Sequence, residues 1–210
     1  MTEKRKAVGQ PDKRRAILDG ALTLFARDGY ARASLDAIAA ESGVSNRTIY
    51  NHFADKAELF QTVIQHSTQR VADTMVDIID RHLSKVVDLE ADLIEFGTAW
   101  LGVLTSGLAP HFALIRQINA ELEHIPPAAL ALWRADGPGR TRRELADRLA
   151  RLAERGELEL PDDSRAAGHL MLLISADNLT VRESLQDEAA VRAMVEAGVR
   201  AFLYGYRPRA

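Results

Sequence analysis

The stretch Ser34–Phe53, SLDAIAAESGVSNRTIYNHF, decides the local fold of the N-terminal part of this chain. Leu35 and Ile38 recur at helical spacing, and Gly43 follows where a helix ends in the left-handed conformation, which glycine adopts without a Cβ penalty. Ser45 then stands where the first backbone N–H groups of a second helix need an N-cap acceptor. The sequence therefore predicts two short helices joined by a tight turn.

The second of these helices is predicted to have one buried edge and one outward face. Ile49 and Phe53 lie four residues apart and would anchor the helix inward. A capped helix that presents polar groups on its other face is typical of the recognition helix of a helix-turn-helix, which lies in the major groove of DNA. The outward residues are Asn46, Arg47, Thr48, Tyr50 and His52.

Helices are also expected on both sides of this motif. Gly29 should end a first amphipathic helix. Asp55 and Glu58 form the acidic version of a capping box and should begin a long helix that runs to about His82. Lys56 falls in its first turn, where the helix dipole favours an anion. A phosphate docked there would explain this lysine, and a solvated lysine is the alternative.

These positions resemble the N-terminal domain of the TetR family of bacterial transcriptional regulators, and residues 111–160 are similar to the C-terminal domain of its AefR-like branch. The resemblance implies a dimeric DNA-binding regulator, usually a repressor, that responds to a small-molecule effector. Arg47 departs from the pattern, because many members have a small residue there. The residues that carry the resemblance are Gly29-Tyr30, Ser34, Ile38-Ala39, Gly43-Val44-Ser45, Thr48-Ile49-Tyr50, Phe53, Lys56 and Leu59-Phe60.

The DNA contacts are expected to fall into two groups. Side chains at the start of the recognition helix would face base edges or nearby phosphates, since arginine can bind guanine bidentately and asparagine can bind adenine in the same way. The others would hold phosphate and so set the register. The first group is Ser45, Asn46, Arg47 and Thr48, and the second is Ser34, Tyr50, His52 and Lys56.

Composition and charge agree with such a protein. The chain has 210 residues, 47% hydrophobic and 27% charged, with no cysteine, so a reducing, cytoplasmic location is expected. Residues 1–56 hold ten Lys/Arg and seven Asp/Glu, a net charge of +3, whereas the remainder has a net charge of −6. A basic end on an acidic body focuses attraction for phosphate at one place. Ordinary scatter of charge is the alternative interpretation.

The whole chain is expected to be all-α, with a disordered tail at 1–10, a three-helix DNA-binding domain at 11–54 and an effector-binding and dimerisation helical bundle at 55–210. The charges at Glu3–Lys6 precede no apolar run, so no secretory signal is expected. The stretch between Glu95 and Arg116 carries no charge, but Gly107 and Pro110 interrupt it. Two buried helices meeting at a turn explain it better than a membrane span.

The last two helices are apolar over more than a single stripe, so each must be covered on two sides. In the TetR family the last two helices form a four-helix bundle with their copies in a second subunit, and a dimer would read two half-sites of a near-palindrome. Intramolecular core is the alternative. The expected interface residues are Ala167, Leu170, Met171, Ile174, Val191, Met194, Val195, Gly198 and Phe202.

An effector site is implied by the resemblance, and residues in the middle of the chain combine apolar bulk with a few polar groups, as ligand pockets do. Simple core and rim is the alternative interpretation for each of them. The candidates are Trp100, Leu104, Phe112, Ile115, Arg116, Asn119, His124 and Trp133.

No pattern in the sequence predicts catalysis, a metal site or a cofactor. Gly137-Pro138-Gly139 lacks phosphate-loop spacing, and the single Glu121-x-x-His124 pair is too little for a di-iron bundle. Two rival interpretations stay open: a helical-bundle enzyme or carrier whose N-terminal unit serves protein contact, and a DNA binder that needs no effector. Salt-dependent binding to duplex DNA would discriminate against the first.

Overall fold

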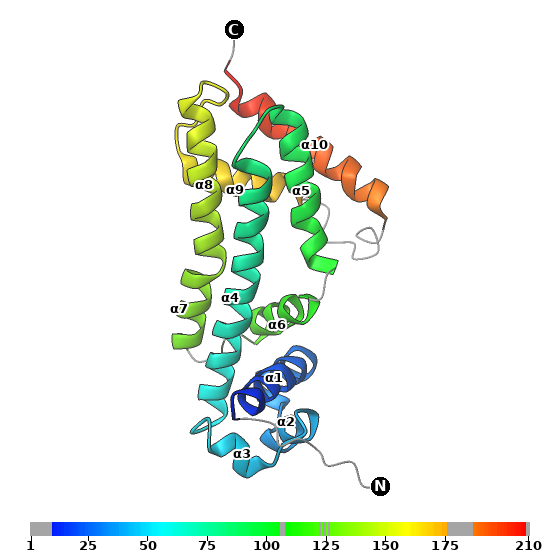
Figure 1. Ribbon diagram of the computed structural model, residues 1–210, viewed down its shortest axis with the longest axis vertical. Coiled ribbons are helices and arrows are strands. Elements are labelled where there is room, and N and C mark those ends of the chain that lie inside the picture. Colours follow the sequence, from blue (N-terminus) through cyan, green and yellow to red (C-terminus); the bar gives the residue numbers. More distant parts are fainter. Residues whose placement is uncertain are drawn as a thin grey trace. The chain divides into compact units, whose positions relative to one another are not determined.

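The computed structural model describes residues 10–105, 108–121, 123, 125, 127–175 and 187–208. Every regular element in these ranges is a helix, which confirms the all-α class (Figure 1). The predicted tail at 1–10 lies outside the described residues, except for Gln10. The helices are α1 (Gln10–Arg32), α2 (Leu35–Glu41), α3 (Asn46–Tyr50), α4 (Lys56–Leu83), α5 (Leu89–Thr105), α6 (Ala109–Ala120), α7 (Pro127–Asp136), α8 (Pro138–Glu154), α9 (Asp163–Ile174) and α10 (Glu188–Tyr206).

The chain forms two compact units, and the boundary between them falls inside α4. Unit 1 is the chain up to Thr68 together with Pro110–Trp133, and unit 2 is Gln69–Ala109 together with Arg134–Ala210. In addition to the helix-turn-helix, unit 1 therefore contains α6 and most of α7. The predicted division at residue 54 concerns where DNA binding ends, and it stays a prediction.

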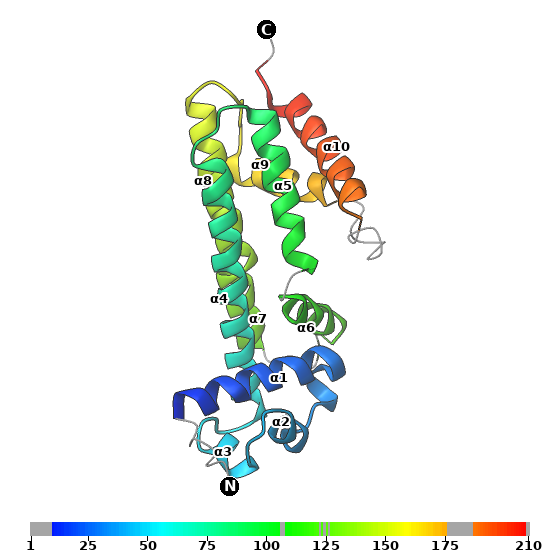
Figure 2. The same ribbon diagram turned by 45° about the vertical axis from the view of Figure 1, so that its right-hand side comes forward.

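A single apolar cluster holds unit 1 together. Phe25 of α1 and Phe60 of α4 meet edge to face with ring centroids 4.8 Å apart, and the Tyr30 ring lies 4.6 Å from that of Phe60. Leu114 and Ile118, one turn apart on α6, are each 1% exposed and belong to the same cluster. Full burial of such a side chain contributes about 1.5–3 kcal/mol. The core that supports the helix-turn-helix thus includes α6, which lies beside α1 (Figures 1 and 2).

Unit 2 is a bundle in which α9 contacts both α8 and α10, and α10 also contacts α5 (Figure 2). Gly198 of α10 lies so close to the Leu173 carbonyl of α9 that a Cβ would collide with it. A glycine at this position therefore sets how closely the two helices approach. Arg140 of α8 also pairs with Asp73 of α4 at 2.7 Å, a largely exposed contact that adds little stability.

The helix ends follow local signals in the sequence. Gly43 and Gly156 follow α2 and α8 with φ values of 64° and 78°, as expected for residues that end helices. Gly29, predicted to end the first helix, is instead a non-helical residue at a kink inside α1, with φ 79° and ψ 171°. Asp162 caps α9 by accepting a hydrogen bond from the Arg165 N–H at 2.8 Å. In the charge-free stretch, α5 ends at Thr105 and α6 begins at Ala109, so Pro110 lies in the first turn of α6. The predicted interruption at Gly107 lies outside the described residues. Among the described residues, no helix is both long and apolar enough to cross a bilayer.

Candidate nucleic-acid interface

The turn between α2 and α3 has the hydrogen bonds of a Schellman motif. The Gly43 N–H donates to the Ala40 carbonyl at 3.2 Å, and the Val44 N–H donates to the Ala39 carbonyl at 3.0 Å. The Val44 side chain packs back against the core of unit 1. The chain therefore reverses within a few residues and presents α3 to solvent on one side.

Ser45 caps α3, as its position in the sequence predicted. Its Oγ accepts a hydrogen bond from the Thr48 N–H at 3.2 Å and lies 2.9 Å from the Thr48 hydroxyl. The two hydroxyls that were expected near DNA therefore hold the start of the helix. One hydroxyl must donate to the other and a phosphate oxygen only accepts, so just one of the two has a proton free for a phosphate while they stay paired.

The two residues predicted to anchor α3 inward are buried. Ile49 and Phe53 are 0% and 2% exposed. Arg47 and Tyr50 are exposed, and the Tyr50 side chain at 58% is among the most exposed large rings of the chain. Asn51 shares their face and was missed by sequence reasoning, although its place four residues after Arg47 was a usable signal.

Asn46 occupies a different environment from Arg47. Its side-chain amide nitrogen donates to Asp36 Oδ1 of α2, and its own Oδ1 is buried without a partner. The side chain therefore ties α3 to α2. Reading adenine through Asn46 would require this hydrogen bond to be exchanged for one to the base.

The expected phosphate contacts lie at helix starts or beside them. Ser34 caps α2 by accepting from the Ala37 N–H at 3.1 Å, and it is exposed. His52 is half-buried beside the Phe53 ring. Arg14 of α1 places its guanidinium 5.5 Å from the centroid of the Phe53 ring. This stacking brings a cation from α1 next to the end of α3.

Lys56 is held by its neighbours in unit 1. Its Nζ donates to the Ala31 carbonyl at 3.1 Å and lies 4.8 Å from the centroid of the Tyr30 ring. Burial lowers the pKa of the Lys56 ammonium, and attraction from Glu121 opposes this effect. The Lys56 ammonium, which was expected to contact DNA, therefore also interacts with Ala31, after Gly29, and with Glu121, after α6.

The candidate effector residues are divided between the two units. Trp100 is 8% exposed in unit 2, whereas Phe112, Ile115, Arg116, Asn119 and Trp133 belong to unit 1. Ile115 and Trp133 are half-buried against the core of unit 1, Phe112 is half-buried beside His111, and Arg116 and Asn119 are exposed. His124 and the side chain of Leu104 lie outside what the structure describes.

Sequence reasoning missed a group of buried polar side chains in unit 1. Ser67, Thr68 and His111 are 4%, 2% and 6% exposed. The His111 Nδ1 lies 3.1 Å from the Ser67 Oγ, so the pair joins α4 to α6. The signal for them was weak, because a hydroxyl on a helix and an isolated histidine fit either surface or core.

Most of the expected dimer-interface residues are buried within the chain itself. Ala167, Leu170, Ile174 and Val195 are 0% exposed, and Phe202 is 1% exposed. These side chains form the packing among α5, α9 and α10, as in the contact of Val195 with Gly97. Gly198 and Val191 are also buried, while Met171 and Met194 are half-buried. The exposed apolar side chains on these helices are instead Leu172 of α9, at 65%, and Tyr204 of α10, at 85%.

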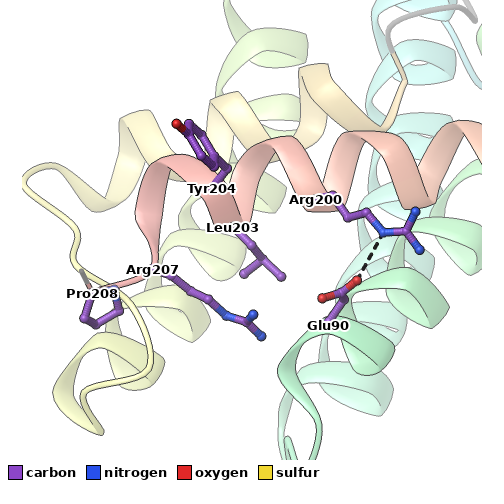
Figure 3. Close-up of a pocket in the computed structure, with 6 residues that line it drawn as sticks. All are labelled: Glu90, Arg200, Leu203, Tyr204, Arg207 and Pro208. Atoms are coloured by element: carbon purple, nitrogen blue, oxygen red, sulfur yellow. Dashed lines mark hydrogen bonds and ion pairs between the residues drawn. The ribbon is translucent and has the colours of Figure 1, made fainter. Parts of the chain in front are cut away.

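A hollow of about 510 Å³ lies next to Tyr204, at the end of α10 (Figure 3). The Arg200 Nε donates to Glu90 Oε1 across it at 3.2 Å. The acid balances part of the positive charge, so the hollow is not a strongly cationic site. Its lining residues are Glu90, Arg200, Leu203, Tyr204, Arg207 and Pro208.

Helix α3 is capped, is buried along one side, and exposes guanidinium, phenol and amide groups on the other side. This arrangement is that of a helix-turn-helix DNA-binding protein. Residues 17–63 match the bacterial regulatory proteins of the tetR family, and residues 91–208 match the AefR-like transcriptional repressor C-terminal domain. The chain therefore belongs to the TetR family of bacterial transcriptional regulators and carries an AefR-like C-terminal domain. Members of this family are regulators and not enzymes.

Curated relatives match over part of the chain. The chain is 38% identical over 73 residues to the HTH-type transcriptional regulator AcrR of Shigella flexneri, a match that covers 35% of this chain and 34% of AcrR. It is 32% identical over 127 residues to the HTH-type transcriptional repressor SCO4008 of Streptomyces coelicolor, covering 56% of this chain and 58% of that protein. The chain thus spans about a third of AcrR and little more than half of SCO4008.

Solved structures match over nearly the whole chain. A TetR-family transcriptional regulator from Mesorhizobium loti has a TM-score of 0.82 at 27% identity, with 98% of this chain and 100% of that chain covered. The flavonoid-responsive regulator FrrA has a TM-score of 0.71 at 28% identity, with 94% and 98% covered. The likeness of the fold therefore extends through both units.

Proposed function

We propose that this protein is a cytoplasmic repressor that binds a near-palindromic operator as a homodimer and releases it when a small molecule binds. The observation that carries the proposal is the exposed face of α3, where Arg47 and Tyr50 stand outward from a capped and anchored helix. Arginine at such a position reads guanine O6 and N7, and the surrounding hydroxyls and cations hold phosphate. Repression follows from the family match and from relatives such as SCO4008.

The dimer in this proposal uses the exposed side of α9 and α10. Leu172 and Tyr204 are large, apolar and exposed. Small side chains at Ala193, Ala197 and Ala201 recur at helical spacing on α10 and are also exposed, so a partner helix can approach closely. The two recognition helices of the dimer must then lie about 34–36 Å apart, or a multiple of that spacing.

Effector release is supported by the match to FrrA, whose name states that it responds to flavonoids. We propose that the effector here is likewise a largely apolar, ring-containing organic molecule, bound in the helical bundle predicted at 55–210. A ligand that binds the DNA-incompetent conformation more tightly shifts the population toward it. Helix α4 contains the boundary between the two units, so it is one covalent route by which such a shift can reach α3. The chain also crosses between the units at 109/110 and 133/134.

The test is selection of bound sequences from a random pool of duplex DNA, repeated in the presence of a panel of metabolites. We expect an enriched near-palindrome, binding that weakens steeply with salt, and loss of enrichment with one class of metabolite. Failure to enrich any duplex at low ionic strength would refute DNA reading. Enrichment that no small molecule abolishes would instead identify a DNA binder without an effector.

A further inference from the structure

Three neutral polar side chains are buried together in unit 1, where the surrounding core is apolar. Thr68, Ser67 and His111 are 2%, 4% and 6% exposed, and Ile64, one turn before Thr68 on α4, is 1% exposed. A hydroxyl in such surroundings is stabilised only when it has a hydrogen-bond partner. The partners of each group therefore indicate whether the cluster is complete.

Ser67 and His111 satisfy each other. The Ser67 Oγ lies 3.2 Å from the Ile64 carbonyl and 3.1 Å from the His111 Nδ1. If the serine proton goes to the carbonyl, Nδ1–H donates to the serine oxygen. Burial lowers the pKa of His111 to about 4, so its ring is neutral at physiological pH. This pair therefore offers hydrogen bonds but no charge.

Thr68 lacks the partner that threonines in helices usually have. The hydroxyls of Thr62 and Thr74, on the same helix, donate to the carbonyls four residues earlier, at 2.8 and 3.0 Å. The equivalent carbonyl for Thr68 belongs to Ile64, which Ser67 engages instead. The Thr68 Oγ1 is buried with no hydrogen-bond partner in the described structure. Its hydroxyl is thus desolvated without a compensating hydrogen bond from the described part of the protein.

We propose that Thr68, together with the Ser67–His111 pair, binds an uncharged hydrogen-bonding group of the effector, such as a phenol, hydroxyl or carbonyl. This inference rests on the effector release proposed above and narrows the effector to molecules that present such a group at one end of an apolar body. A carboxylate at this position would be buried against neutral groups without a cation, which is costly. None of these three residues was a candidate from the sequence.

The test compares Thr68→Val with Thr74→Val in the full-length protein. Both substitutions remove one hydroxyl from α4, but the Thr74 hydroxyl already donates a hydrogen bond to the backbone carbonyl of Arg70. The probes are 7-hydroxyflavone, unsubstituted flavone, a flavone carboxylate and a panel of simple phenols, ketones and amides, each with its carboxylate analogue. Affinity is measured by calorimetry and by the shift in melting temperature, without DNA.

We expect uncharged hydrogen-bonding probes to bind wild type and Thr74→Val equally, and to bind Thr68→Val about tenfold more weakly. Thr68→Ser, which retains the hydroxyl, should restore binding. Without probe, Thr68→Val should melt no lower than wild type, because the deleted hydroxyl has no partner in the protein. Carboxylate analogues should bind weakly to every variant. Equal affinity in Thr68→Val, preferred binding of carboxylates, or no binding by any probe would overturn the proposal.

The proposed function is tested separately by operator release. Probes that bind through Thr68 but leave operator DNA bound would uphold the site and refute its role as an effector site. Loss of operator binding in the wild-type protein under all conditions would refute the proposed function, while the calorimetric result for Thr68 would stand.

Discussion

Glu121 accepts a hydrogen bond from the backbone N–H of Ala31, 90 residues earlier, at 3.3 Å. The carboxylate follows the last turn of α6 and packs against Gly29, so closely that a Cβ on Gly29 would collide with it. Lys56 donates to the carbonyl of the same Ala31. The part of α1 that follows Gly29 is therefore held from two sides, by the start of α4 and by the residue after α6.

This contact predicts a larger cost for alanine at Gly29 than at Gly43. Gly29 has φ 79° and ψ 171°, a region almost restricted to glycine, and substitution should cost about 1–3 kcal/mol before the collision with Glu121 is counted. Gly43, at φ 64° with open space around it, should cost about 1 kcal/mol. Urea unfolding measures both. Adding Glu121→Ala to Gly29→Ala should recover part of the loss, and equal costs at the two glycines would contradict this account.

Arg47→Ala should relax sequence choice. Loss of a bidentate contact to guanine removes about 1–3 kcal/mol of discrimination at one position of each half-site. The measurement is the affinity for the selected operator and for operators changed at single base pairs. Arg15→Ala, which changes another exposed arginine of unit 1, is the control and should leave the preference intact. An unchanged preference in Arg47→Ala would show that Arg47 does not read a base.

Lys56→Gln should weaken binding to all duplexes about equally. Glutamine can still donate to the Ala31 carbonyl, so the fold is retained while the charge is lost. The slope of log affinity against log salt should fall in magnitude by about 1 per phosphate contact removed. If the slope stays the same while the affinity for a single sequence changes, Lys56 does not act through phosphate.

Leu172→Glu should produce monomers. The side chain is 65% exposed on α9, so the charge is tolerated by the isolated chain but not inside an apolar interface. Val87, 86% exposed after α4, provides the matched control, and Val87→Glu should remain dimeric. Sedimentation gives the mass and an operator titration gives the affinity. A Leu172→Glu protein that stays dimeric would place the interface elsewhere.

Stability should decline in acid because of His111. Burial lowers its pKa from 6.5 to about 4, so the unfolded chain binds a proton at His111 below about pH 6.5 while the folded chain does not. The free energy of unfolding should therefore be unaffected by this group above pH 6.5, fall by about 2 kcal/mol at about pH 5 and by about 3 kcal/mol at about pH 4. Urea unfolding of His111→Gln should lack this component, whereas His169→Gln should keep it.

Signals that act within one or two helical turns were predictable from the sequence. Gly43 and Ser45 specify the turn and cap of α3 by their own backbone and side-chain chemistry, so the helix-turn-helix was predicted with its anchors Ile49 and Phe53. The assignment of apolar residues to a dimer face stays a prediction. An apolar helix face looks the same in sequence whether another part of the chain or another copy covers it.

The sequence by itself determined the all-helical class, the position of the helix-turn-helix and the family of the protein. It could do so because capping, glycine turns and helical periodicity are local properties. Only the tertiary structure decided that α6 completes the core of unit 1, that Asn46 turns toward Asp36, that Val195 and Phe202 are internal while Leu172 and Tyr204 are exposed, and that the Thr68 hydroxyl is buried without a partner. Each of these depends on which distant segment covers a given face, and that choice is made by long-range packing.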